Sequence, residues 1–374
     1  MFRGMLGRNP GQTTIRTWLA KAGLDALKCK SRNHDEAYCI IMDASISVND
    51  QQMLLALKVP ADHTGKALTH ADEDVVGMAV SGNWPAAKVK EFCEEIAEEQ
   101  GHSPEYYLTD NGKNLSRADE LLELPHHRDI SHTLAVYLKQ VYGKDEEFVA
   151  FKNLVGNTKH LALTKFAYLM PAKQRSMVRF MNLYPIVDWA KKILDNYHRM
   201  TADERYFYSF VTRNASLVEE LDEVMTTYAD MMKICKKEGF SVANVARCKK
   251  LLAQRLPSGS ERPRRLRDMI ADYLDTKSKL LTSEHPSHNI SSYIIESDFG
   301  IFKDSMPSNK TNGVAESILH IPLRPKMCSL ENVERLDIKD VMERRTFAEV
   351  KMWKLTALRP NRLKRGVEGV DTGC

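Results

Sequence analysis

Short apolar runs in the first third of the chain predict the strands of a sheet. Such runs occupy residues 37–43, 52–59, 74–81 and 106–110. Runs of this length are typical of buried strands and are shorter than most helices. Polar Asn49-Asp50 lies between the first two runs and has the composition of a hairpin turn, so we expect those two strands to be neighbours.

Segments with helical spacing separate and follow these strands. In segment 86–100 apolar residues recur at every third or fourth position, and Gly101 signals the end of the helix. A short helix at 114–123 and a short fifth strand at 125–129 follow. This order predicts an α/β fold with a mixed five-stranded sheet and helices on both faces.

The pattern changes after residue 131. From about 132 to 282 we find only helical periodicity, which predicts a large all-helical insertion between two parts of the α/β core. An extended stretch at 289–295 leads back into the core. The predicted domains are 1–36 (N-terminal helical segment), 37–132 (first part of the core), 133–285 (helical insertion), 286–328 (second part of the core) and 329–374 (basic helical tail).

The N-terminal segment contains an amphipathic helix at 13–29, with Gly23 where the helix is expected to end. Two interpretations stay open. The helix is the remnant of a helix-turn-helix DNA-binding domain whose first helix is missing, or it is a packing helix of the core.

Composition describes an ordinary globular protein. Of the 374 residues, 43% are hydrophobic and 28% are charged, and no apolar stretch reaches the roughly 18 residues of a membrane span. The seven cysteines are scattered singly, without metal-binding spacing, which indicates free thiols in a reducing cytoplasm.

Charge adds a weaker signal. The net charge is only +4, but basic residues cluster at 262–267 and 359–365. Such clusters suit a nucleic-acid partner and are also common on solvated helix faces. The acidic run 91–99 is expected on the solvated face of its helix.

Three acidic residues follow apolar runs and are the candidate catalytic groups. Asp43 and Asp110 end two predicted strands, and Glu296 is followed seven residues later by Lys303. Carboxylates that converge on one sheet edge repel one another unless a cation holds them, and hard divalent cations prefer oxygen ligands. The pattern therefore points to metal-assisted phosphodiester chemistry.

With these acids in this order, residues 37–325 resemble a DDE transposase of a bacterial insertion sequence. In that family the first Asp lies on the first strand, the second follows the fourth strand, and a Glu heads a helix with a basic residue seven later. Further similar motifs are Asp129-Ile-Ser-His132, Trp189 within the insertion, and the segment 291–300 around the third acid.

The resemblance implies an RNase H-like core that cleaves the ends of a DNA element and transfers the strand to target DNA. It implies two Mg²⁺ ions, with Mn²⁺ as a substitute, held by Asp43, Asp110 and Glu296. The implied contacts to DNA are Lys303, Trp189, Arg175 and Arg179. We expect a homodimer or higher multimer on DNA. We also expect it in the nucleoid of a bacterial cytoplasm, without membrane association.

Several alternatives stay open at the level of residues. Glu316 also has a plausible setting for the third acid, although Pro322 interrupts the helical spacing to a base after it. Trp189 is a base-stacking residue or a core aromatic, and Arg175 and Arg179 are phosphate contacts or solvated residues.

The histidine-rich segment 126–132 lacks the spacing of a structural zinc site. We therefore expect Asp129 and His132 to brace the fifth strand against the next helix near the site.

Two other functions share these features. One is a DNA-binding protein without catalysis, derived from a decayed or domesticated transposase. The other is a structure-selective nuclease with an RNase H-like fold, which the length of the helical insertion disfavours.

Overall fold

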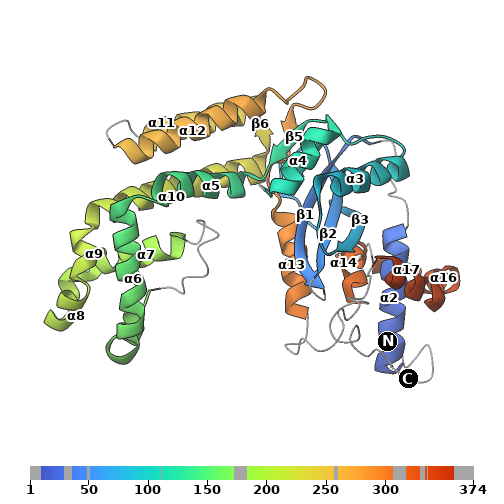
Figure 1. Cartoon of the computed structure of the whole chain (residues 1–374), viewed down its shortest axis with the longest axis horizontal. Coiled ribbons are helices and arrows are strands. Elements are labelled where there is room, and N and C mark those ends of the chain that lie inside the picture. Colours follow the sequence, from blue (N-terminus) through green and yellow to red (C-terminus); the bar gives the residue numbers. More distant parts are fainter. Residues whose placement is uncertain are drawn as a thin grey trace, which may run out of the picture. The chain divides into compact units, whose positions relative to one another are not determined.

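The computed structural model describes residues 10–28, 36–48, 51–110, 112–171, 183–256, 260–305, 317–328, 333–334 and 336–357 (Figure 1). The chain forms two compact units. The core unit comprises 1–62, 68–127 and 292–374, and the helical unit comprises 63–67 and 128–291. The ends of the main helical segment, 128 and 291, lie a few residues from the predicted 133 and 285, whereas the inclusion of 63–67 was not predicted. The N-terminal helix and the described C-terminal helices belong to the core unit.

The core unit has a mixed α/β architecture. Its strands are β1 (Tyr38–Val48), β2 (Gln51–Pro60), β3 (Asp74–Ser81), β4 (Tyr106–Thr109) and β5 (His126–Arg128). Its longer helices are α2 (Gln12–Lys28), α3 (Ala86–Gln100), α4 (Lys113–Leu122), α13 (Tyr293–Ser305) and α17 (Phe347–Ala357). Shorter helical segments are η4 (Ser317–Leu319), α14 (His320–Leu323), η5 (Arg324–Lys326) and α16 (Ile338–Arg344).

The five strands form one sheet in the order β3-β2-β1-β4-β5. Strand β2 pairs antiparallel with both β1 and β3, whereas β4 pairs parallel with β1. The sequence-based prediction of a mixed five-stranded sheet is confirmed. The turn at Asn49-Asp50 lies outside the described residues, but Val48 pairs with Gln51 across it, as a hairpin requires.

Strand β1 is longer than the apolar run that predicted it. Asp43 was expected to close the strand, yet β1 continues to Val48 and Asp43 pairs with Leu55 of β2. Polar residues beyond Asp43 can extend the strand because pairing with β2 satisfies their backbone groups. Asp43 lies at an end only with respect to β4, whose last partner on β1 is Met42.

Alternating side chains of the sheet fill two apolar layers. One layer contains Cys39 and Ile41 of β1 and is covered by α2, α13, η4, α14 and α17. The opposite layer contains Ile40 and Met42 and is covered by α3 and α4. The acidic residues of α3 are exposed, as predicted, and Gly101 ends this helix with a φ of 81°.

Helix α2 is an integral part of the core unit. Ala20 and Leu24 are buried against the sheet layer that α13 also covers. The prediction that the helix ends at Gly23 is wrong. Helix α2 continues past Gly23 to Lys28. A Cβ built on Gly23 would lie 1.9 Å from the carbonyl oxygen of Leu319, so the glycine is needed for close approach to η4.

Helix α13 begins earlier than the sequence pattern suggested. The residues before Glu296 were predicted to be extended, but α13 starts at Tyr293. A short apolar run fits a strand or a buried helix equally well. Ile295, Phe299 and Phe302 recur at helical spacing and are buried in the core, which decides for the helix.

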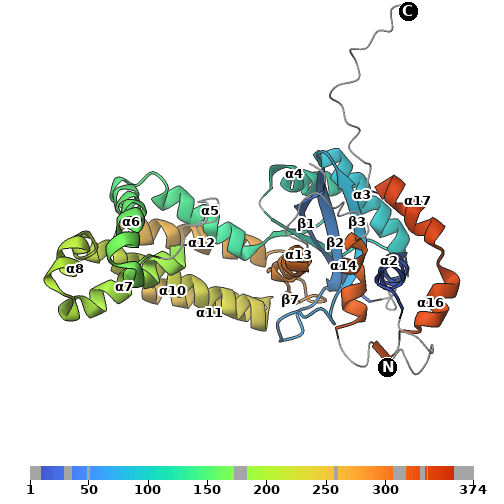
Figure 2. The same ribbon diagram turned by 90° about the horizontal axis from the view of Figure 1, so that it is seen from below.

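The helical unit contains the predicted insertion (Figure 2). Its helices are α5 (Ile130–Tyr142), α6 (Glu146–Lys165), η1 (Ala167–Leu169), α7 (Tyr184–Asn196), η3 (Tyr197–Arg199), α8 (Ala202–Phe207), α9 (Ser209–Arg213), α10 (Ala215–Glu238), α11 (Val242–Arg255) and α12 (Glu261–Ser278). The long helix α10 packs against α5, α7 and α11. Two short strands, β6 (Phe240–Ser241) and β7 (Ser287–His288), pair antiparallel and were missed because two residues show no periodicity.

Among the described residues, no helix has both the length and the apolar composition needed to cross a membrane.

Candidate functional site

The pairing of β1 with β4 determines where the first two predicted acids lie. The two strands run parallel, and the last residues in register are Met42 and Thr109. Asp43 and Asp110 are the next residues on each chain segment. The sheet therefore places these two acids at adjacent positions, although they are far apart in the sequence.

Side chains of a strand alternate between the two faces of the sheet, and by this alternation both acids belong to the face that α13 covers. Asp43 follows Ile41 by two positions, and Asp110 follows Leu108 by two positions. Ile41 and Leu108 are completely buried in the layer beneath α13. Asp43 and Asp110 are half-buried, so this face opens toward solvent where the two acids lie.

Backbone amides hold one oxygen of each carboxylate. Asp43 Oδ1 accepts a hydrogen bond of 2.7 Å from the amide of Ala44. Asp110 Oδ1 accepts one of 2.8 Å from the amide of Gly112, which precedes α4. A Cβ on Gly112 would lie 2.8 Å from the same oxygen, so a larger residue would crowd the carboxylate.

Glu296 and Lys303 lie on the exposed side of α13, beside its buried stripe. Seven residues are about two helical turns, so both side chains project from the same face. The ammonium Nζ of Lys303 donates to Ser45 Oγ of β1 at 3.4 Å. The third acid and its basic partner thus belong to the helix that packs against the strand of Asp43.

The three predicted acids do not form a ready-made ion site. In the described parts of the chain, one group of three acidic, histidine or cysteine residues has its ligand atoms all within 4.8 Å of one another. That group is His70, Glu73 and Asp298, not Asp43, Asp110 and Glu296. A metal shared by the three predicted acids stays a prediction.

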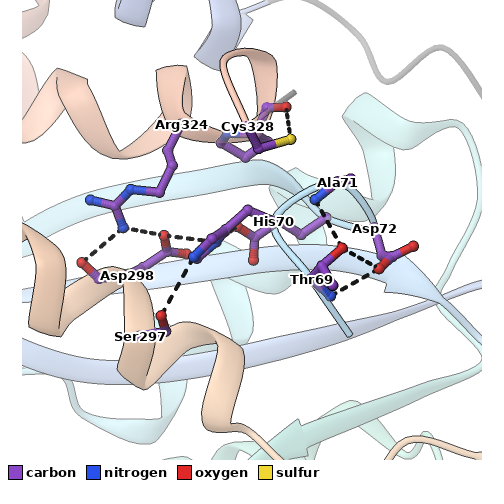
Figure 3. Close-up of polar contacts among 10 residues, drawn as sticks. Thr69, His70, Ala71, Asp72, Ser297, Asp298, Arg324 and Cys328 are labelled. Atoms are coloured by element: carbon purple, nitrogen blue, oxygen red, sulfur yellow. Dashed lines mark hydrogen bonds and ion pairs between the residues drawn. The ribbon is translucent and has the colours of Figure 1, made fainter. Parts of the chain in front are cut away.

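The group of His70, Glu73 and Asp298 is a candidate metal centre inside the core unit. Figure 3 shows His70 and Asp298 of this group beside Arg324. His70 Nδ1 lies 2.7 Å from Glu73 Oε1 and 3.5 Å from Asp298 Oδ1. Arg324 Nη1 donates to Asp298 Oδ1 at 2.6 Å and also to the Asp298 carbonyl oxygen at 3.2 Å. Both carboxylate side chains are completely buried, whereas His70 is 21% exposed.

Burial controls the ionisation of this group. It raises the pKa of the Glu73 carboxyl to about 8. Burial, with the nearby charge of Glu73, raises the pKa of Asp298 to about 7, although Arg324 acts in the opposite direction. Burial lowers the pKa of His70, against the effect of Asp298. Without a further cation, the site is therefore poised to hold a proton.

A tight turn before β3 fixes His70 and Glu73. Asp72 Oδ2 accepts hydrogen bonds from the amide and the hydroxyl of Thr69, at 2.9 and 2.7 Å. The amide of Asp72 donates in return to the Thr69 carbonyl at 2.9 Å. Short polar side chains that bond to nearby backbone favour such turns. Helix α13 and η5 then supply Asp298 and Arg324.

Sequence reasoning missed this group. The one local signal is the spacing His70-Ala71-Asp72-Glu73, which also has the composition of an ordinary turn. The third member, Asp298, lies on α13 two residues after Glu296 and is far from His70 in the sequence.

Asp129 caps the N-terminus of α5. Its Oδ1 accepts a hydrogen bond of 2.8 Å from the amide of His132. Its own carbonyl accepts from Thr133. This contact is an N-cap. The predicted role of Asp129 and His132 in bracing the fifth strand near the site stays a prediction.

Trp189 is a core residue of the helical unit. Its side chain is 8% exposed, and its indole Nε1 donates to the Leu169 carbonyl at 2.9 Å. Tyr208 packs edge-on against the indole, with ring centroids 6.0 Å apart. The core alternative therefore accounts for Trp189, and the indole face is not available for stacking on a base in this conformation.

The remaining predicted residues divide into two groups. Arg175, Arg179, Glu316 and the basic cluster 359–365 lie outside the described residues. In the other basic cluster, Arg262 contacts Asp145, Glu147 and Glu220 and so serves the packing of the helical unit. The histidine-rich segment 126–132 contributes no group of metal-ligating residues within the described chain.

No protein-family model and no curated protein matches this sequence. Function is therefore inferred from the geometry of two sites in the core unit, the predicted acids Asp43, Asp110 and Glu296 and the group of His70, Glu73 and Asp298.

Proposed function

We propose that this chain is a DDE-type transposase that cleaves and joins DNA phosphodiesters with an RNase H-like core. The observation that carries the proposal is the register of β1 and β4. It places Asp43 and Asp110 at adjacent positions on the sheet face that α13 covers. The resemblance requires the first acid on the first strand and the second after the fourth, on neighbouring strands.

Two further observations support it. Glu296 is exposed in the first turn of α13, and that helix packs against β1. Lys303 contacts Ser45, two residues beyond Asp43. The basic residue of the family pattern thus contacts the strand of the first acid, and Glu296 lies on the same face of that helix.

The donor set suits Mg²⁺, because it consists of oxygen ligands and because adjacent carboxylates repel unless a cation neutralises them. Asp43 and Asp110 would hold the metal, with Glu296 as the third ligand. When bound, two Mg²⁺ ions would supply a nucleophilic oxygen at neutral pH and stabilise the leaving oxygen. Lys303 orients the phosphate through its positive charge, and the amides of Ala44 and Gly112 fix the two aspartates.

The test uses the full chain and duplex DNA that carries the sequences flanking this reading frame in its native DNA. With Mg²⁺ we expect nicks that leave a 3′-hydroxyl at a defined end, followed by joining to a second duplex. Asp43→Asn and Asp110→Asn should each abolish both steps while binding of the same DNA in a gel-shift assay is preserved.

Glu91→Gln is the matched control, because Glu91 is an exposed acid on α3, which covers the opposite face of the sheet. It should cleave like the wild type. Cleavage by Asp43→Asn at the wild-type rate contradicts the proposed site. DNA binding by the wild type without any Mg²⁺-dependent cleavage favours the alternative of a catalytically silent DNA-binding protein. Cleavage at branched DNA without strand transfer favours a structure-selective nuclease.

A further inference from the structure

We propose that His70, Glu73 and Asp298 bind one divalent transition-metal ion of the Zn²⁺ or Mn²⁺ class, at a site separate from the catalytic acids. Imidazole nitrogen together with carboxylate oxygen is a donor set that such ions favour, whereas Mg²⁺ prefers oxygen alone. The ligand atoms of the three residues already lie within 4.8 Å of one another.

Two buried oxygens of the group have no hydrogen-bond partner. They are Glu73 Oε2 and Asp298 Oδ2, and both side chains are completely buried. A buried carboxylate oxygen without a partner is costly, since it has lost its water and gained nothing in exchange. Arg324 compensates only the other oxygen of Asp298. A cation between the two carboxylates would satisfy both unpartnered atoms.

His70 is oriented as a metal ligand. Its Nδ1 faces both carboxylates, and its Nε2 lies 3.4 Å from Ser297 Oγ. If Nε2 carries the proton and donates it to Ser297, Nδ1 has a free electron pair for a metal. Ligating histidines commonly donate their other ring N–H to a neighbouring polar group in this way. Arg324 fixes the Asp298 carboxylate through its hydrogen bond to Oδ1, as Ser297 would fix the His70 ring.

Helix geometry separates this site from the predicted catalytic one. Glu296 and Asp298 are two residues apart on α13, which corresponds to about 200° around the helix axis. Glu296 is exposed and Asp298 is completely buried, so their side chains point in different directions. A single ion cannot bind both. The inner ion instead ties the turn before β3 to the helix that carries Glu296 and Lys303.

The experiment measures metal binding without DNA, so its outcome does not depend on the proposed catalysis. Purified full-length chain is stripped with a chelator, saturated with Mg²⁺ to occupy the catalytic acids, and titrated with Zn²⁺. We expect one Zn²⁺ per chain by elemental analysis and an increase in Tm. Co²⁺ bound in place of Zn²⁺, with the imidazole of His70 as a ligand, should give a visible absorption band.

Variants assign the ligands. His70→Gln and Glu73→Gln, which keep the side-chain volume, should abolish saturable binding and the Co²⁺ band. Ser297→Ala should weaken binding about tenfold, as loss of an outer hydrogen bond to a ligating histidine does. Asp43→Asn should retain one ion. His198→Gln, at an exposed histidine of the helical unit, is the control for adventitious binding.

Circular dichroism shows whether each variant is folded. If His70→Gln and Glu73→Gln are folded and bind Zn²⁺ like the wild type, the assignment is wrong. The wild type and His198→Gln are titrated up to the ion concentration at which both precipitate. If the wild type takes up no ion below that concentration, the group holds a shared proton and the proposal is overturned.

Discussion

Lys303 of α13 donates a hydrogen bond to Ser45 of β1, two residues beyond Asp43. This contact sets the exposed face of α13 beside the strand of the first predicted acid. Glu296 shares that face with Lys303, because seven residues are close to two full turns. The contact therefore connects the third predicted acid to the first through one helix.

Replacing the third acid should remove activity without affecting the fold. Glu296→Gln is expected to abolish Mg²⁺-dependent DNA cleavage, whereas its free energy of unfolding should stay within about 0.5 kcal/mol of the wild type, as for exposed positions in general. Urea denaturation and the cleavage assay measure the two effects. Glu316→Gln is the matched comparison, since it tests the alternative third acid. Loss of cleavage in Glu316→Gln with full activity in Glu296→Gln would reverse the assignment.

The charge of Lys303 should matter more than its contact with Ser45. Lys303→Met is expected to lower the cleavage rate about 10- to 100-fold, because a hydrogen bond to a charged group contributes roughly 1.5–3 kcal/mol. Ser45→Ala removes the partner but keeps the charge, so it should cleave almost normally. Equal losses in the two variants would indicate that Lys303 acts by packing α13 onto β1.

Strands β1 to β4 could be predicted because each contains a buried apolar run, whereas β5, His126–Arg128, contains none. That signal is local, and so the order of elements from β1 to β4 follows from it. The residues that end or begin helices were harder. Gly23 has the composition of a helix end, but its function depends on Leu319, which no local pattern connects to it.

The inner site shows the same limit more strongly. His70 and Ser297 are separated by 227 positions, and only the packing of the turn before β3 against α13 brings them together. A pair of buried carboxylates is visible only after burial is known. By contrast, Asp43 and Asp110 were predicted because each follows an apolar run, although the length of β1 beyond Asp43 was not.

Gly23 should tolerate no side chain. Gly23→Ala places a methyl group 1.9 Å from the Leu319 carbonyl oxygen, so α2 or η4 must move. We expect a loss of about 1–3 kcal/mol in the free energy of unfolding, the usual cost of overpacking. Gly300→Ala is the control, because it is helical and has open space around the new methyl. Alanine is the better helix former, so that variant should gain about 0.5–1 kcal/mol. Unchanged stability in Gly23→Ala would contradict the close approach of α2 to η4.

Trp189 should affect stability rather than DNA binding. Trp189→Leu keeps an apolar group in the core but loses the hydrogen bond to Leu169 and part of the packing. We expect it to lower the free energy of unfolding by about 1–3 kcal/mol. Its affinity for DNA, measured by gel shift on the folded variant, should be unchanged.

Tyr206→Leu serves as the comparison for Trp189, since Tyr206 is an aromatic residue of the same unit that is 86% exposed. It should leave the free energy of unfolding unchanged. Strong loss of DNA affinity in folded Trp189→Leu, with normal affinity in Tyr206→Leu, would restore the base-stacking interpretation.

Protonation of His320 of α14 should oppose folding. Burial, and then the charge of Arg324, lower the pKa of His320 below its ordinary value of 6.5. The unfolded chain therefore takes up a proton at a higher pH than the folded chain does. The contribution of neutral His320 to stability is complete above pH 6.5, and it is lost as the pH falls from there through the lower pKa of the folded state.

His320→Gln removes this titration, so when the pH is lowered from 7.5 to 5.5 the free energy of unfolding should fall less, or rise more, in the variant than in the wild type. Urea denaturation at both pH values measures it. His198→Gln is the comparison, because His198 is exposed and should leave the wild-type pH dependence unchanged. Identical pH dependence in wild type and His320→Gln would mean that His320 can be protonated without cost where it lies, and that burial beside Arg324 does not hold it neutral.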